Sequence, residues 1–415
     1  MTIASTGLAP FGGIARHRKG VAAILAASMI VVLLGLAALA LDIGYLYMNR
    51  GQLQTSADSG SLAGAQVLVH DGLVKAVPDY ATGQTNARAT AVQYASANRV
   101  GINLPSVDSN SSNSTDGDVV LGYMSDPSDP NCTLDFSNPL LYNAVQVRVR
   151  KDSKKNGLVE SFFSRIWGNP GEPLAARATS VVSSSIVGFK VTSESGNADL
   201  MPFAVKKESW DAVMAAAGTD QYTVASNEVT AGPHDDSVQI VGTDNYTVSS
   251  TGVVSGGSDG IMELSMYPLE NDAAGNFGTV DVGSADNSTN TLDRQIRSGV
   301  SAQDLGFIGG SLVLGSDGTL QLNGDTGVSA ALKDALLSVQ GKPKAIMLYS
   351  TVTDNGNNAT YTIVGFVGIR VLHVKLTGSP KYVIVQPSAV IDASALIGKS
   401  PNQSKYLYSN VRLVR

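Results

Sequence analysis

The sequence predicts an α+β protein with one membrane-crossing helix. We expect an N-terminal transmembrane helix that continues into a long helix packed on a small antiparallel sheet, followed by a β-rich C-terminal domain that is sandwich-like or barrel-like. Three observations predict this class: an uncharged apolar run over residues 20–41, small residues at helical spacing directly after it, and many short strand-like segments toward the C-terminus.

Size and composition limit the possible functions. The chain has 415 residues, of which 43 % are hydrophobic and only 15 % are charged, below the roughly 25 % of average soluble proteins. The net charge of −6 does not favour binding to nucleic acid, so we expect no such partner. Cys132 is the single cysteine, which excludes an intrachain disulfide and a metal site built on cysteine.

The apolar run has the length of a transmembrane helix. Residues 20–41 carry no charge, and Ser28 is their only polar side chain. As a helix they rise about 33 Å, against roughly 30 Å for the hydrocarbon core of a bilayer. Three basic residues precede the run, namely Arg16, Arg18 and Lys19. By the positive-inside rule, residues 1–19 form a basic cytoplasmic N-terminus, and the chain after residue 41 lies across the membrane.

The same run could also be a cleaved signal peptide. Ala38–Ala40 offers a small-x-small cleavage site. The run, however, exceeds the about 7–15 apolar residues of a typical signal peptide, and helix-favouring residues continue past the site. We therefore expect the helix to be retained, with cleavage after Ala40 as the alternative.

A helical pattern of small residues follows the run without a proline. Leu53, Ala57, Gly60 and Gly64 fall on one helix face. Each glycine costs a helix about 1 kcal/mol relative to alanine, so a close packing contact should offset it. That contact could be with this chain's own fold or with other subunits of a bundle. The candidate assembly residues on this helix seam are Gln54, Ala57, Asp58, Gly60, Ala63 and Gly64.

Residues 42–191 predict one α+β domain. We expect a second helix over Ala87–Arg99, with Gly101 able to cap its C-terminus, and a polar loop over residues 105–118. Residues 144–152 predict a half-buried strand, because valines alternate there with polar residues. A boundary is predicted at residues 192–202, and residues 203–415 form the β-rich extracytoplasmic domain.

Residues 157–168 carry a second apolar stripe. Leu158, Phe162 and Ile166 recur at four-residue steps, with Phe163 and Trp167 beside them. The spacing predicts a buried amphipathic helix. A wedge that inserts into the membrane is the alternative.

The N-terminal segments resemble a known family. "LALDIGYLYMNRGQLQTSADSGSLAGA" and "YASANRVG" are similar to the N-terminal domain of TadG-like (TadE/TadG-like) proteins of the Flp pilus, or tight adherence, assembly system. The resemblance covers residues 14–100 well and extends loosely to about residue 190. The matching residues are Asp42, Leu53, Gln54, Ala57, Asp58, Leu62, Ala63, Gly64 and Ala65.

The resemblance implies a role rather than a reaction. It implies a component of a Tad/Flp pilus or related secretion apparatus, in the bacterial inner membrane, that anchors or assembles the pilus or is a minor subunit of it. Its partners would be the membrane and other envelope or pilus-assembly proteins. Gly20 lies where type IV-like prepilins are cleaved, but the fifth residue after it is Leu25 instead of the glutamate of pilins. This departure disfavours polymerisation as a major pilin.

No motif in the sequence predicts chemistry. There is no G-x-S-x-G nucleophile motif, and the histidines lack the spacing of metal ligands. We therefore expect no catalytic residue, no cofactor, no metal site and no small-molecule substrate. Two alternatives to the pilus role stay open: a membrane-tethered surface adhesin or binding protein, and a secreted hydrolase whose site is not recognised.

Overall fold

The structure is a computed structural model. It describes residues 18–75, 77–192, 194–215, 222–225, 228–231, 247–248, 254–255, 259–267, 276–283, 288–354, 356–378, 381–398, 404 and 406–414. Residues 1–17 of the predicted basic N-terminus lie outside this set. The chain divides into two compact units, and each is described by itself. The first unit comprises Met1–Ser56, Ser96–Ser106 and Val149–Ala176, and the second comprises Ala57–Ala95, Val107–Arg148 and Arg177–Arg415.

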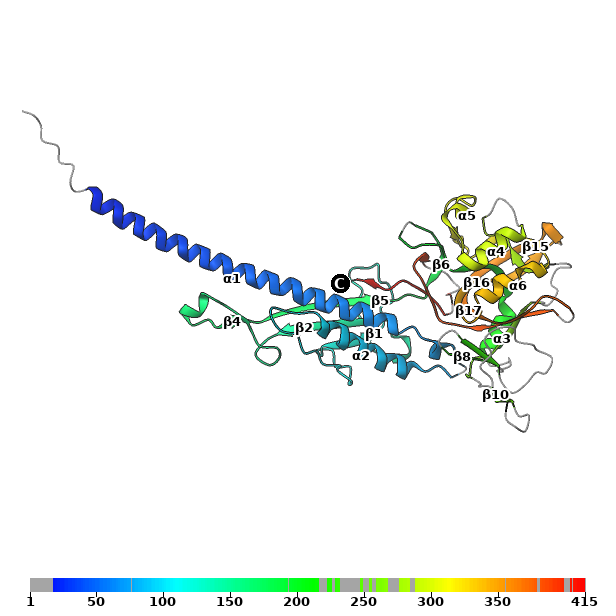
Figure 1. Ribbon diagram of the computed structural model, residues 1–415, viewed down its shortest axis with the longest axis horizontal. Coiled ribbons are helices and arrows are strands. Elements are labelled where there is room, and N and C mark those ends of the chain that lie inside the picture. Colours follow the sequence, from blue (N-terminus) through cyan, green and yellow to red (C-terminus); the bar gives the residue numbers. More distant parts are fainter. Residues whose placement is uncertain are drawn as a thin grey trace, which may run out of the picture. The chain divides into compact units, whose positions relative to one another are not determined.

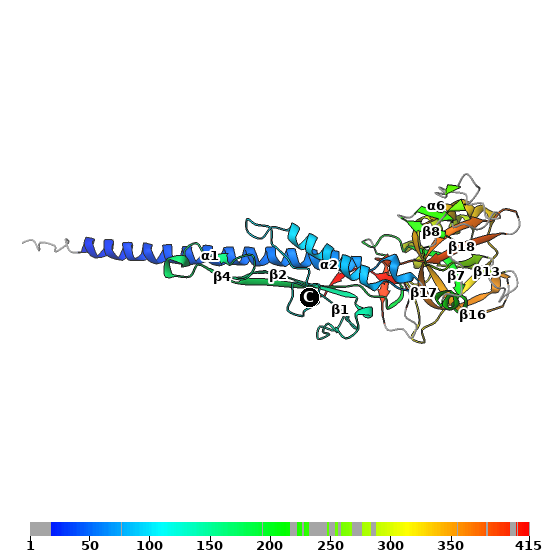
Figure 2. The ribbon, with the colours of Figure 1, turned by 90° about the horizontal axis from the view of Figure 1, so that it is seen from below.

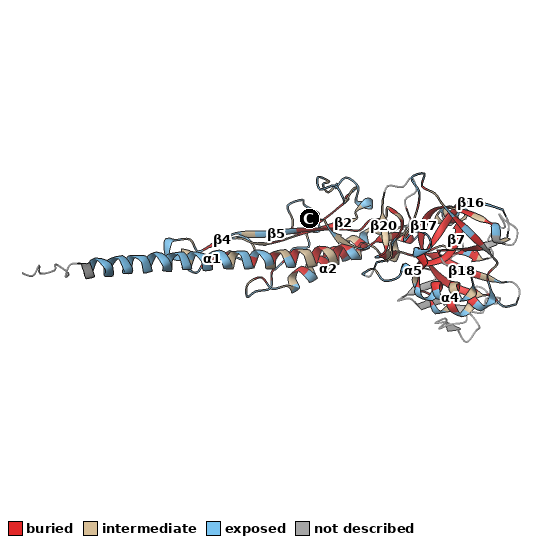
Figure 3. Ribbon diagram, turned by 90° about the horizontal axis from the view of Figure 1, so that it is seen from above, coloured by how far each residue is buried: buried red, intermediate tan, exposed pale blue. Residues whose placement is uncertain are grey.

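One helix, α1, runs without a break from Arg18 to Val67, a length of 50 residues. Its N-terminal part is exposed on all sides, whereas buried positions recur along its C-terminal part (Figure 3). The composition explains the helix, because apolar residues and alanines fill its first half and no proline interrupts the second. The predicted continuation of the apolar helix into a long helix is confirmed (Figure 1).

In the first unit, residues 96–106 pack on α1. The backbone N–H of Gly101 donates to Oε1 of Gln52 at 2.7 Å. Gly101 has a φ of +65°, and a Cβ there would lie 3.2 Å from both Tyr45 Oη and Asn49 Oδ1. A glycine is therefore required twice at this position, once by the left-handed backbone and once by the close approach to α1.

The predicted buried helix over residues 157–168 is wrong. The segment forms a two-stranded hairpin, β3 (Val159–Glu160) with β4 (Gly171–Glu172), whose loop contains the 3₁₀ helix η3 (Ser164–Trp167). Ile166 is 76 % exposed and Trp167 is 77 % exposed. The apolar spacing predicted that these side chains would be buried against the rest of the protein, but in the structure they are exposed.

In the second unit, helix α2 (Tyr80–Ala97) and the C-terminal end of α1 both contact a four-stranded sheet, α2 through Arg88 to Val119 and α1 through Ser61 to Ser180. The helix begins seven residues before the predicted Ala87, because Asp79 accepts a hydrogen bond from the N–H of Thr82 at 3.0 Å and acts as its cap. The sheet has the order β1-β2-β5-β22. Its strands are β1 (Val119–Gly122), β2 (Ala144–Lys151), β5 (Leu174–Val181) and β22 (Arg412–Leu413). The predicted alternation along β2 is confirmed, since Val145 and Val147 are fully buried.

The β-rich part of the second unit contains a closed ring of strands. The long strand β17 pairs with β15, β16 and β18, and β7 pairs with β13 and, in parallel, with β16. Strands β17, β15, β13, β7 and β16 therefore close on themselves in a barrel-like arrangement, and β18 and β12 extend it. The strands are β7 (Leu200–Lys206), β12 (Leu264–Tyr267), β13 (Asn276–Val280), β15 (Leu320–Thr326), β16 (Pro343–Thr353), β17 (Thr360–Lys375) and β18 (Tyr382–Pro387).

Alternate residues of these strands supply two hydrophobic cores. Along β7, Met201 and Phe203 enter one core, whereas Leu200 and Ala204 enter the other. Helices α3, α4 and α6 contribute to the first core, for example through the fully buried Trp210. The helices are α3 (Lys207–Met214), α4 (Thr289–Ser298), α5 (Ala302–Gly306) and α6 (Lys333–Ser338). Because both faces of β7 are buried, the strand reads as a continuous apolar run.

Short elements complete the second unit. Strands β6, β14 and β20 form a three-stranded sheet, and β19 pairs in parallel with β21. Their bounds are β6 (Ile186–Phe189), β14 (Leu312–Val313), β19 (Val390–Asp392), β20 (Ala395–Ile397) and β21 (Leu407–Ser409). Strand β8 (Tyr222–Ala225) pairs with β9 (Glu228–Ala231), and β10 (Thr247–Val248) pairs with β11 (Val254–Ser255). The described 3₁₀ helices of this unit are η1 (Asp71–Val74), η2 (Pro139–Leu141), η4 (Ala330–Leu332) and η5 (Gly356–Asn358).

Candidate functional site

The apolar part of α1 has no protein around it. Its most apolar 18-residue window has a mean hydropathy of 2.8 and is 0 % buried. Val31 is 69 % exposed and Leu34 is 65 % exposed. Exposed apolar surface on this scale is unfavourable in water and marks a contact with lipid or protein. The described chain has one helix that is long and apolar enough to cross a membrane, which indicates a membrane anchor.

Asp42 ends the apolar segment and binds a distant loop of the same unit. Its two carboxylate oxygens accept four hydrogen bonds from three successive backbone N–H groups, with N···O distances of 2.8 Å from Phe162, 3.2 and 3.1 Å from Phe163, and 2.9 Å from Ser164. The three amides belong to the start of η3, and an anion there is favourable because those N–H groups have no partner within the helix. Asp42 thus holds the β3–β4 loop against α1.

The protonation state of Asp42 follows from the same contacts. Burial by itself raises the pKa of this carboxyl, but the backbone N–H groups of Ser164, Phe162 and Phe163 together outweigh it, so the pKa of Asp42 lies below its usual range. The charged form is therefore the one that the loop binds. Its contribution is complete above the pKa of an unfolded aspartate and is lost only as the pH falls through the lower, folded value.

The small residues of α1 form the seat of α2. A Cβ added to Gly60 would lie 2.8 Å from the backbone oxygen of Ala91 and 2.8 Å from Cβ of Ala95. A Cβ on Gly64 would lie 2.9 Å from Cβ of Ala91. Figures 1 and 2 both show α2 alongside this part of α1. The two glycines therefore allow the two helix backbones to approach closely, as small residues do in helix pairs.

The other predicted seam residues lie around this contact. Ala57 is fully buried, while Asp58 and Ala63 are half-buried. Gln54 is also half-buried on α1, and both Gln54 and Asp58 have interaction partners within the protein. The structure thus brings Ala57, Gly60 and Gly64 into the packed interior. Their role in contacts with other proteins stays a prediction.

Sequence reasoning missed a buried hydrogen bond beside the seam. Ser61 is fully buried on α1, and its hydroxyl lies 2.8 Å from the hydroxyl of Ser180 on β5. Ser59 donates to the backbone oxygen of Tyr94 on α2 at 3.3 Å. Serine in a helix of small residues gives no sequence signal of this kind, because its partner lies more than a hundred positions away.

A buried arginine organises the polar loop. Arg88 on α2 donates to the backbone oxygens of Ser109, Asn110 and Val119 at 3.2, 2.8 and 3.1 Å, and to Oδ1 of Asn113 at 2.7 Å. Burial lowers the pKa of Arg88, but a guanidinium stays charged at neutral pH. Four acceptors compensate that charge, so Arg88 is a structural residue that fixes the loop predicted from composition alone.

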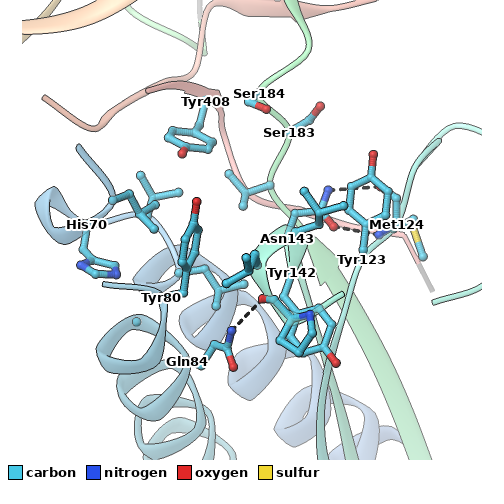
Figure 4. Close-up of a pocket in the computed structure, with 18 of the residues that line it drawn as sticks. His70, Tyr80, Gln84, Tyr123, Met124, Tyr142, Asn143, Ser183, Ser184 and Tyr408 are labelled. Atoms are coloured by element: carbon cyan, nitrogen blue, oxygen red, sulfur yellow. Dashed lines mark hydrogen bonds between the residues drawn. The ribbon is translucent and has the colours of Figure 1, made fainter. Parts of the chain in front are cut away.

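Pockets in the second unit include one of about 450 Å³ beside Arg88 and Tyr142 and one of about 220 Å³. Figure 4 shows His70, Tyr80 and Gln84 along one side, with Tyr142, Asn143 and Tyr408 facing them. The lining contains hydroxyls and amides but no acidic residue, lysine or arginine. Nδ1 of His70 accepts from the N–H of Gly72 at 3.1 Å, and burial lowers the pKa of the imidazole. His70 therefore serves as the cap of η1, and the pocket is smaller than a typical ligand site.

No arrangement for metal binding occurs among the described residues, since no three His, Cys, Asp or Glu side chains are grouped there. The candidate functional surface is α1, because its apolar half is exposed. It combines an exposed apolar half, a charged residue that binds a loop at its midpoint, and a close-packed half that carries α2.

Comparison with known proteins gives two family matches. The family described as Flp pilus-assembly TadE/G-like matches residues 20–67, and the family described as Tad-like Flp pilus-assembly matches residues 63–180. The two matches meet within the C-terminal end of α1. No curated protein and no solved structure matches the chain. The resemblance seen in the sequence is thus confirmed over residues 20–180.

We predict opposite effects for alanine at two glycines of α1. Gly60→Ala should lower the free energy of unfolding by about 1–3 kcal/mol, because the new Cβ meets the backbone of α2. Gly51→Ala is the matched control: no atom lies within 4 Å of its Cβ, so the free energy should rise by roughly 0.5–1 kcal/mol. Chemical unfolding of the full chain in detergent, followed by circular dichroism, measures both. Equal effects at the two positions would contradict the close contact.

Proposed function

We propose that this chain is a non-enzymatic, single-pass membrane protein that anchors or assembles a Tad/Flp pilus or a related secretion apparatus, or is a minor subunit of it. Its partners would be other pilus-assembly proteins of the bacterial envelope. The support is that residues 20–180 match the Flp pilus-assembly TadE/G-like and Tad-like family models. The observation that supports this most directly is that one unbroken helix, α1, contains both the apolar segment and the small-residue segment after it, and that the TadE/G-like match covers both.

A continuous helix of this kind suits an anchor. A flexible linker after the apolar segment would let the folded part move freely, whereas α1 continues for more than six turns after Asp42 and carries α2 on its small residues. The apolar segment and the start of the fold therefore share one helix.

The sequence of the apolar segment argues against a major pilin. Pilin subunits carry a glutamate at the fifth position of the mature chain, and the fifth residue after Gly20 is Leu25. No acidic residue occurs anywhere in residues 20–41. Without the glutamate carboxylate, the segment lacks the charge that aligns neighbouring subunits in the apolar core of a pilus filament. We therefore favour a retained anchor over a polymerising subunit.

We place the N-terminus in the cytoplasm and the rest of the chain outside it, in the periplasm or at the cell surface. The support is the basic residues before the apolar segment and the absence of basic residues in the first positions after it. The membrane would be the bacterial inner membrane, as the family role requires.

The single cysteine offers a direct test of orientation. Cys132 is half-exposed, so a membrane-impermeant maleimide should label it in intact spheroplasts. A Cys132→Ser chain carrying Ser5→Cys is the matched control, and it should be labelled only after lysis. The reverse pattern would contradict the proposed orientation.

The pilus role is tested by deletion and complementation. A strain without this protein should lose surface Flp fibres, measured in sheared fractions, and the wild-type chain should restore them. A chain whose residues 20–41 are replaced by a scrambled apolar sequence should also restore them, because an anchor needs length and hydrophobicity. A chain secreted with a cleavable signal peptide in place of those residues should fail. Normal amounts of surface fibres in the deletion strain would contradict the pilus role. Normal fibres together with a loss of adhesion would favour a surface adhesin.

A further inference from the structure

The loop between β3 and β4 presents an apolar surface that the protein itself does not cover. Phe162 is 60 % exposed, Ile166 is 76 % exposed and Trp167 is 77 % exposed. All three lie within six residues of one another, at the start and along η3. Single exposed apolar side chains are common, but two aromatic rings and an isoleucine on one short loop need an explanation.

Contacts within the first unit fix where this loop lies. The carboxylate of Asp42 holds the amides of Phe162, Phe163 and Ser164. The ring of Phe162 packs edge-on against Tyr45, with the ring centroids 5.0 Å apart. Ala38, one turn before Asp42, is the single residue of 20–41 that is half-covered, while the others are exposed. The loop is therefore attached at the end of the apolar segment of α1.

The pictures agree with these contacts. In Figures 1 and 2 the tip of the hairpin, beside the label β4, lies alongside α1 and points toward the N-terminal end of that helix. That direction leads from Asp42 back along the apolar segment.

This position determines what the loop meets. If residues 20–41 cross the hydrocarbon core, Asp42 lies at its boundary, since 22 helical residues rise about 33 Å. A loop held at Asp42 must then lie in the interfacial layer of the same membrane. Trp and Tyr favour that layer because their rings are amphipathic, and Tyr47, just beyond Asp42 on α1, is 70 % exposed. Arg165 is also exposed and forms an ion pair with Glu160 at 3.4 Å, and its long side chain can extend toward the headgroups.

We propose that the β3–β4 loop is a second membrane contact, an interfacial wedge whose Phe162, Ile166 and Trp167 side chains enter the boundary between headgroups and acyl chains beside α1. Asp42 is the residue that positions the wedge. Its carboxylate can remain charged at this depth because three amides satisfy it. The wedge and α1 together fix both the depth and the tilt of the anchor, which one helix alone leaves free.

In this proposal, lipid covers the exposed side chains of the β3–β4 loop. The apolar segment and the loop belong to one compact unit and are joined by hydrogen bonds and a ring contact, so lipid around the first is adjacent to the second. The inference depends on α1 crossing a membrane and not on any role in pili. It would stand if the pilus proposal failed.

The two tryptophans allow a direct test. Trp167 is exposed, and Trp210 is fully buried in the second unit. The full chain is reconstituted in phosphatidylcholine vesicles with plain or brominated acyl chains, and the Trp167→Phe chain reports Trp210 alone. We expect bromines placed near the glycerol end of the chains to remove most of the Trp167 emission, and bromines near the chain ends to remove less. The Trp210 emission should be unchanged in both.

Two results would overturn the wedge. One is Trp167 emission that is equal in plain and brominated lipid and has the long wavelength of a ring in water. The other is a short-wavelength emission without quenching, which means that a protein surface, such as a second copy or another subunit, covers the loop.

Asp42 is tested with the same readout. Asp42→Ala removes every acceptor for the three amides, so Trp167 should lose its preference for the shallow bromines. Asp42→Asn keeps one acceptor oxygen and should show an intermediate loss. Unchanged depth in both variants would remove Asp42 from the proposal. The comparison of the wild-type chain with Trp167→Phe still decides the wedge if a variant at Asp42 fails to fold.

Discussion

The carboxylate of Asp42 marks the point where α1 changes its surroundings. Before it, the helix has an exposed apolar surface on every side; after it, one face is packed in the protein. A charge at this boundary is tolerable because three backbone amides of a distant loop satisfy it. The contact joins residues 120 positions apart in the chain, and it ties the hairpin of the first unit to the end of the membrane segment. This interaction and the ring contact between Phe162 and Tyr45 locate the exposed apolar loop.

Beyond Asp42, the helix is shaped by close approach instead of by charge. Gly60 and Gly64 lower the intrinsic stability of the helix, but they allow α2 to lie directly on the backbone of α1. Ser61 adds a buried hydrogen bond to the sheet. These contacts occupy the small-residue face within the chain itself.

Part of this structure could be predicted from the sequence. The length of the apolar run and the helical spacing after it depend on local pattern, and both predicted α1 correctly. The valine alternation of β2 is equally local. The prediction of a buried helix over residues 157–168 was wrong, because an apolar stripe indicates that a surface avoids water but not whether protein or lipid covers it. Asp42, Arg88 and Ser61 were missed as structural residues because each has partners far away in the chain, and pairings such as β7 with β16 have no local signal.

The central claim is that the apolar segment and the folded part stay one continuous chain in the mature protein. Mass spectrometry of the protein extracted from membranes tests it most directly, by the mass of the intact chain and of its N-terminal peptide. If the anchor is retained, the chain still contains residues 20–41 joined to residue 42. A chain that begins at Val21 would keep the anchor and reveal processing after Gly20. A soluble chain that begins at Leu41 would contradict a retained anchor, because the mature protein would then lack residues 20–40 of the apolar segment.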